Sequence, residues 1–210
     1  MLEFTAYTKT LIGLLAVLNP LGAVPIFVAM TPGASDDQRR EIARVVVIAV
    51  TLILLAALVF GEVLLDFFGI SINSFRVGGG ILILLMAISM LQAKVSGTVH
   101  TEAEKEDSGS KSSVAVVPLA TPLLAGPGAI STVILYADRG SGAIHYTLIA
   151  VDILLLCALL WLVFKALPWI SRHISQTGIN IFTRIMGLIL AALSIEFIAS
   201  GLKGLFPALA

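Results

Sequence analysis

Charge and cysteine are both scarce in this sequence of 210 residues. Charged side chains make up 12% of it, and its 13 basic and 13 acidic residues balance to a net charge of zero. This balance gives no reason to expect nucleic acid as a partner. The single cysteine, Cys157, lies in an apolar run, and a lone cysteine excludes an intramolecular disulfide framework.

Catalytic and metal-binding motifs are missing as well. The sequence contains no HExxH pattern, no GxSxG elbow and no Walker loop, and its three histidines lack the spacing of metal ligands. We therefore expect no metal, no other cofactor and no enzymatic activity.

Apolar residues are abundant instead. They make up 58% of the chain, and the mean hydropathy of +1.04 is too high for an ordinary soluble domain. About 20 apolar residues in a helix cross the roughly 30 Å of hydrocarbon in a bilayer. Such runs occur at residues 6–30, 43–67, 74–93, 114–137, 144–166 and 183–203. The sequence therefore predicts an all-α integral membrane protein with six transmembrane helices.

The distribution of polar and basic residues predicts the domain organisation and the orientation. Residues 94–113 form a polar, acidic linker between a first three-helix unit, residues 1–93, and a second, residues 114–210. Nine of the 13 basic residues lie in the loops after spans one, three and five, and four lie on the other face. The positive-inside rule then places the linker in the cytoplasm and both termini outside, on the periplasmic face.

Two clusters of proline and glycine interrupt apolar spans, one at the front of each half. They occupy residues 19–25 and residues 121–128. Proline removes a backbone donor and clashes with the preceding turn, so we expect the first and fourth helices to be broken there. A restarting half-helix offers free N–H groups to a carboxylate, and the preceding half offers carbonyl groups to an ammonium.

Paired breaks of this kind are typical of transporter binding sites. Ordinary proline kinks, stabilised by neighbouring helices, are the alternative. Short side chains and glycines at the breaks leave room for only a small, zwitterionic substrate. The candidate substrate-binding residues are Asn19, Pro20, Gly22, Pro25, Thr121, Gly126, Pro127, Gly128, Ser131 and Thr132.

Two carboxylates lie inside predicted spans and are candidates for proton coupling, because intramembrane carboxylates are costly and usually functional. Glu196 shares a helical face with the small residues Ala192, Ala199 and Ser200, which favours it as the residue on a polar path. Asp152 has leucines around it on its helical face, and these make a polar path past Asp152 a weaker expectation.

The sequence also contains an internal repeat. Three matches occur in the same order: residues 48–58 with 149–159, residues 76–82 with 184–190, and Pro20 with Pro127. A unit of three spans must enter the bilayer from the opposite face in its second copy. The sequence therefore predicts a 3+3 inverted repeat, an arrangement that supports alternating access.

The two break motifs, residues 19–27 and residues 118–130, resemble those of the MarC family of bacterial inner-membrane proteins, which includes SnatA-type transporters of small neutral amino acids. The resemblance extends to the length, the six spans and the acidic linker. It implies transport of amino acids such as glycine or alanine, with substrate held at the broken helices in the inner membrane. The exact substrate, the direction of transport, the coupling ion and the oligomeric state stay open.

Two other functional classes are weighed against transport. One is a membrane channel or scaffold. The other, more remote, is an intramembrane serine hydrolase with Ser131 as nucleophile, which needs a histidine within hydrogen-bond reach. His145 and His173 are predicted near opposite membrane faces, which disfavours this second alternative.

Overall fold

The computed structural model describes residues 4–92, 124–206 and 208, and these ranges contain helices and no strand. Serine side chains accept hydrogen bonds from the first turn at three helix starts, namely α3, α4 and α9. The helices are α1 (Phe4–Leu18), α2 (Pro20–Met30), α3 (Asp36–Phe67), α4 (Ile72–Leu91), α6 (Pro127–Ala137), α7 (Ala143–Lys165), α8 (Leu167–His173) and α9 (Gln176–Leu205).

Five stretches are long and apolar enough to cross a membrane, and they correspond to predicted spans one, two, three, five and six. Of the fourth span, the structure describes the second half as α6, 11 residues long. The linker at residues 94–113 and the first half of the fourth span lie outside the described residues. The helices α3 and α9 begin seven residues before the predicted spans, because Ser35 and Ser175 cap them in front of the apolar region.

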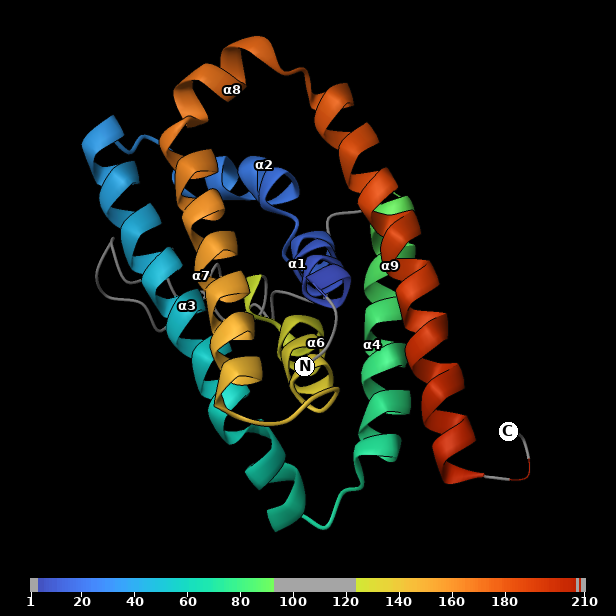
Figure 1. Ribbon diagram of the computed structural model, residues 1–210. Helices are drawn as coiled ribbons and strands as arrows, with labels where there is room; N and C mark the ends of the chain where they lie inside the picture. Colours follow the sequence, from blue (N-terminus) through green and yellow to red (C-terminus); the bar gives the residue numbers. More distant parts are fainter. Residues whose placement is uncertain (1–3, 93–123, 207, 209–210) are drawn as a thin grey trace.

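The helices form two antiparallel pairs with the broken helices between them. Figure 1 shows α3 beside α7 on one side and α4 beside α9 on the other, with α1, α2 and α6 in the space between. The short helix α8, which hydropathy alone does not predict, connects α7 to α9 at one end. Each half of the chain thus contributes one helix to each pair.

The pair α4 and α9 is held by close backbone approach. A methyl group on Gly80 would lie 3.0 Å from the carbonyl oxygen of Ser194, and one on Gly187 would lie 3.2 Å from that of Ala87. Small residues allow such contact, which supplies dispersion energy where lipid offers no hydrophobic driving force. Gly80 and Gly187 therefore serve the association of these two helices.

The outer surface of the helices is apolar. Leu52 and Phe60 of α3 are 63% and 64% exposed, and Leu188 of α9 is 60% exposed. A soluble protein rarely leaves large apolar patches open, so these side chains face lipid.

Two of the sequence matches do not survive in the structure. The match of residues 76–82 with 184–190 pairs Gly80, which is buried, with Leu188, which is 60% exposed, so it is wrong by one residue.

The eleven-residue match of α3 with α7 fails for the same reason. Val50 and Leu54 of α3 are fully buried, but the residues matched to them by the eleven-residue repeat, Val151 and Leu155 of α7, are 43% and 55% exposed. Equivalent positions in a repeat should face the same environment. This match therefore reflects the similar composition of two apolar helices, and its alignment of α3 with α7 is wrong.

Candidate functional site

The first predicted break is a single residue wide. Helix α1 ends at Leu18 and α2 begins at Pro20, while Asn19 between them has φ 43° and ψ 65°. It is the one residue other than glycine with positive φ in the part of the chain that the structure describes. Asparagine tolerates this left-handed conformation better than most residues because its short amide bonds locally. The break thus depends on the identity of residue 19.

The Asn19 side chain connects the break to two elements. Its Oδ1 accepts a hydrogen bond from the backbone N–H of Gly22 at 3.3 Å, which caps α2. Its Nδ2 donates to Thr183 Oγ1 of α9 at 3.4 Å. A methyl group on Gly22 would overlap the Asn19 amide, so the cap requires glycine at this position.

Pro25 lies inside α2 and does not interrupt it, which corrects the expectation that the first break extends to this residue. Both prolines nevertheless remove a backbone donor. The carbonyl oxygen of Ala16 cannot be bonded by residue 20, nor that of Leu21 by residue 25. Two acceptors are therefore released next to the break.

Of the second predicted break, the structure describes the start of α6. Gly126 precedes α6 in an extended conformation, with φ −70° and ψ 178°, and no side chain caps the helix. Pro127 occupies the first helical position and has no N–H, and the N–H of Ile130 bonds the carbonyl oxygen of Gly126. This helix start presents the N–H groups of Gly128 and Ala129. Thr121 lies outside the described residues.

The structure brings the first break close to the start of α6. Helices α1 and α6 are in contact, as Figure 1 shows at the centre of the molecule. A methyl group on Gly128 would lie 3.7 Å from Val17 Cγ1, two residues before Asn19, and would overlap the sulfur of Met86 in α4. The end of α1 and the start of α6 are thus neighbours in the protein interior.

Ser131 and Thr132 lie one turn into α6 and are buried. The Thr132 hydroxyl donates to the carbonyl oxygen of Gly128 at 2.7 Å. Ser131 packs against α4, where a methyl group on Gly79 would lie 3.0 Å from its Cβ. Thr132 therefore bonds within the first turn of α6, whereas Ser131 contacts α4.

The two intramembrane carboxylates have opposite environments. Asp152 is 8% exposed on α7, and its Oδ2 is buried with no hydrogen-bond partner among the described residues. Glu196 is exposed on α9 and does not face the breaks. The structure therefore favours Asp152, whereas the pattern of neighbouring small residues in the sequence favours Glu196.

Polar contacts fasten the far end of α6, and the sequence gives little sign of them. The Tyr7 hydroxyl and His145 Nδ1 are 3.0 Å apart, while His145 Nε2 lies 3.2 Å and 3.0 Å from the carbonyl oxygens of Tyr136 and Ala137. Arg76 Nη2 of α4 donates to Asp138 Oδ2 at 2.7 Å. Buried Tyr and His with separated partners leave no local pattern, because their contacts form only in the fold.

The chain matches a known family. Residues 4–206 match the family described as MarC family integral membrane protein. The chain belongs to the MarC family.

Close relatives support this membership. The UPF0056 membrane protein YhcE of Escherichia coli is 42% identical over 207 residues, which cover 99% of this chain and 96% of the relative. YvbG of Bacillus subtilis is 41% identical over 208 residues, covering 98% of each. A UPF0056 membrane protein of Methanocaldococcus jannaschii is 38% identical over 189 residues, covering 90% of this chain and 92% of the relative. No solved structure matches the chain.

MarC family membership and the apolar exterior establish an integral membrane protein with several spanning helices. The basic residues are unevenly placed in it. Arg39, Arg40 and Arg44 lie at the start of α3, at the same end of the molecule as Lys165 at the end of α7 (Figure 1). Placement of this end in the cytoplasm, with both termini outside, stays a prediction of the positive-inside rule.

Proposed function

We propose that this MarC family protein is a secondary transporter of small neutral amino acids, of the glycine and alanine type, that works by alternating access. The observation that carries the proposal is the contact between α1 and α6, which places the end of one half-helix beside the start of another. Meeting half-helix ends inside an apolar bundle are expensive unless a ligand or water satisfies them.

The polar groups at the junction are complementary to a zwitterion. The uncapped start of α6 offers the N–H groups of Gly128 and Ala129 and a partial positive charge, which suit a carboxylate. The carbonyl oxygens released near the first break, on Ala16 and Leu21, suit an ammonium group. Met86 and Val17 lie close to Gly128, and this crowding favours a small substrate.

A revised internal repeat supports alternating access. The spacing that separates Pro20 from Pro127 places two 11-residue helices in register, each with proline at its first position. The same spacing relates the helix caps Ser35 and Gly142. It also aligns buried positions of α4 and α9: Gly80 with Gly187, Ile83 with Leu190, Ala87 with Ser194, and Met90 with Phe197.

The antiparallel pairing of α3 with α7 and of α4 with α9 fits two inverted copies of one unit. If the two copies exchanged their conformations, the binding site would open to the opposite side of the membrane. The contacts of Arg76 with Asp138 and of Tyr7 with His145 would close one face and would part when it opens.

Asp152 is our candidate for proton coupling. An unpaired carboxylate buried among apolar side chains is costly as an anion, so it needs either a proton or a transient cationic partner. Proton-coupled transport would supply the proton. Glu196 is exposed on the outside of α9, so we do not place it on the substrate path.

The alternatives have less support. Both ring nitrogens of His145 lie within hydrogen-bonding distance of groups other than Ser131, and Nδ1 of His173 lies 2.9 Å from the carbonyl oxygen of Trp169. A serine hydrolase would need one of these bases at Ser131. A channel or scaffold would require neither the paired half-helices nor a buried unpartnered carboxylate.

Uptake of labelled glycine and alanine into proteoliposomes, with and without a pH gradient, tests the proposal. We expect saturable uptake of the small amino acids and little uptake of leucine. Absence of flux for every small amino acid would contradict it, and steady single-channel currents would favour a channel. Labelling of Ser131 by a serine-reactive probe would support the hydrolase.

A further inference from the structure

A pocket far from the broken helices carries an inference of its own. It has a volume of about 260 Å³ and lies between the start of α3 and the end of α7. Its lining residues are Arg40, Ala43, Arg44, Trp161 and Lys165, and we call it the basic pocket. Three of the five side chains are cationic and none is acidic, so the pocket favours an anion.

The cations of the basic pocket have little internal compensation. Arg40 Nη1 lies 3.6 Å from Asp37 Oδ1, but the two side chains are 64% and 94% exposed, so water screens this pair. Among the described residues, Arg44 and Lys165 have no ion pair. Lys165 Nζ lies 4.9 Å from the centre of the Trp161 ring, which orients the ammonium without neutralising it.

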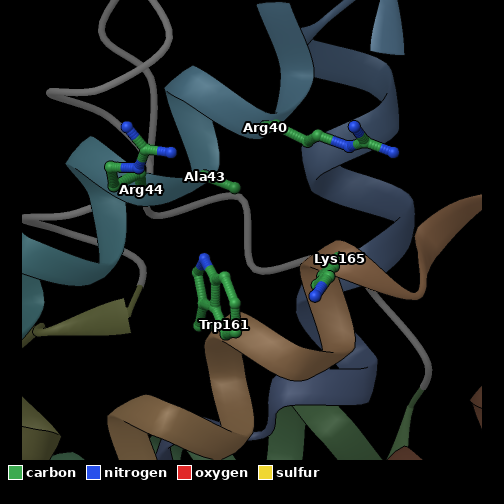
Figure 2. Close-up of a pocket in the computed structure, with 5 residues that line it drawn as sticks. All are labelled: Arg40, Ala43, Arg44, Trp161 and Lys165. Atoms are coloured by element: carbon green, nitrogen blue, oxygen red, sulfur yellow. The ribbon is translucent and has the colours of Figure 1, made fainter. Parts of the chain in front are cut away.

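The position of the pocket along the helices indicates the boundary of the bilayer. Arg44 directly precedes the charge-free stretch of α3 at residues 45–60, and Lys165 directly follows that of α7 at residues 153–164. Tryptophan is typical of membrane interfaces, where its ring lies at the level of lipid headgroups. Figure 2 shows Trp161 of α7 facing Ala43 and Arg44 of α3.

Below the basic pocket, toward the middle of the bilayer, both helices present an open apolar surface. Ile48 and Leu52 follow Arg44 at intervals of four residues and are 51% and 63% exposed. Leu154 lies seven residues before Trp161, on the same face of α7, and is 50% exposed. Cationic groups above an apolar strip fit a phosphate that continues into acyl chains.

We propose that the basic pocket binds the phosphate headgroup of an anionic phospholipid, with the acyl chains along the apolar strip between α3 and α7. Basic pockets between spanning helices recognise anionic headgroups in this way. Such a lipid would bridge one helix from each half of the chain. None of the break residues lines the pocket, so this inference does not depend on the proposed transport.

Native mass spectrometry of the full-length protein in detergent tests the assignment. The probes are dioleoyl phosphatidylglycerol, which is anionic, dioleoyl phosphatidylcholine, which is zwitterionic, and inorganic phosphate as a headgroup without chains. We expect phosphatidylglycerol adducts to exceed phosphatidylcholine adducts at equal concentration. Equal retention of both lipids, or displacement of phosphatidylglycerol by millimolar inorganic phosphate, would overturn the proposal.

Substitutions locate the site. Arg44→Gln and Lys165→Gln should each weaken phosphatidylglycerol binding about fivefold, from the contribution of one basic residue at an anionic surface. Arg44→Lys should retain most of the phosphatidylglycerol binding, because the positive charge is kept. Lys203→Gln, which removes one charge from the last turn of α9 at the opposite end, is the matched control. Adducts are counted on folded protein only. Equal phosphatidylglycerol binding by the double variant Arg44→Gln, Lys165→Gln and by the control would contradict the site.

Discussion

Asn19 donates a hydrogen bond from Nδ2 to Thr183 Oγ1, and this bond ties the break in the first span to α9. The same side chain caps α2 through Oδ1 while the backbone of Asn19 keeps a left-handed conformation. One residue therefore performs three structural tasks, which different substitutions remove in different combinations.

Substitution of Asn19 should destabilise the protein in graded steps. Asn19→Leu loses the cap, worth about 1 kcal/mol, and places a branched residue in the left-handed region, which costs roughly 1–2 kcal/mol. Asn19→Gly keeps the conformation and should lose only the cap and the Thr183 bond. Thr183→Val removes that bond alone, for about 0.5–1.5 kcal/mol. Chemical unfolding in detergent measures all three, and equal stability of the leucine and glycine variants would contradict the strained conformation.

Gly128 should be intolerant of any side chain. Gly128→Val would displace Met86 and Val17, with an overpacking cost of about 1–3 kcal/mol, and would cover the N–H groups at the start of α6. We expect glycine binding to fall at least about tenfold, or 1.4 kcal/mol, as measured by isothermal titration calorimetry.

Gly78→Val is the matched control for this prediction, because a methyl group on Gly78 would meet nothing within 4 Å. Adding Met86→Ala to Gly128→Ala should recover part of the stability without recovering full binding. Normal glycine affinity in Gly128→Val would remove the start of α6 from the binding site.

The two intramembrane carboxylates should respond differently to neutralisation. Asp152→Asn keeps the shape of the side chain but cannot carry a proton. We expect it to abolish the stimulation of glycine uptake by a pH gradient while counterflow exchange of glycine continues. Glu196→Gln should leave the stimulation intact because Glu196 is exposed on the outside of α9. The reverse result would assign proton coupling to Glu196.

The ion pair between Arg76 and Asp138 should stabilise one closed face of the protein. Its N···O distance is 2.7 Å, and the side chains are 20% and 26% exposed. A hydrogen bond to a charged group contributes about 1.5–3 kcal/mol. Arg76→Glu and Asp138→Arg should each lower stability, and the double swap should restore much of it. Independent, additive effects in this double-mutant cycle would show that the pair is not coupled.

Local sequence signals predicted the break itself but not its width. Proline at position 20 cannot continue a helix from α1, so the interruption follows from covalent chemistry. Pro25 carries the same chemistry, yet α2 runs through it. A helix can lose one hydrogen bond when its neighbours hold both sides in place. Whether a proline breaks or only weakens a helix is therefore decided by its surroundings.

The internal repeat shows the same limit. Apolar spans share few residue types, and an eleven-residue match with seven identities arose between them by composition alone. It paired positions that face lipid with positions that face the interior. The matching prolines gave a more dependable register, since a proline at the first helical position has a specific structural role. In that register, buried residues of α4 align with buried residues of α9.

The sequence by itself determined five of the spanning helices and the location of the first break, because hydropathy and proline chemistry act over a few neighbouring residues. The tertiary structure decided which groups meet. It placed Val17 beside Gly128, turned Asp152 inward and left Glu196 outside. The physical reason is that the rotation of a helix in a membrane is set by packing against other helices. No stretch of one span contains that information.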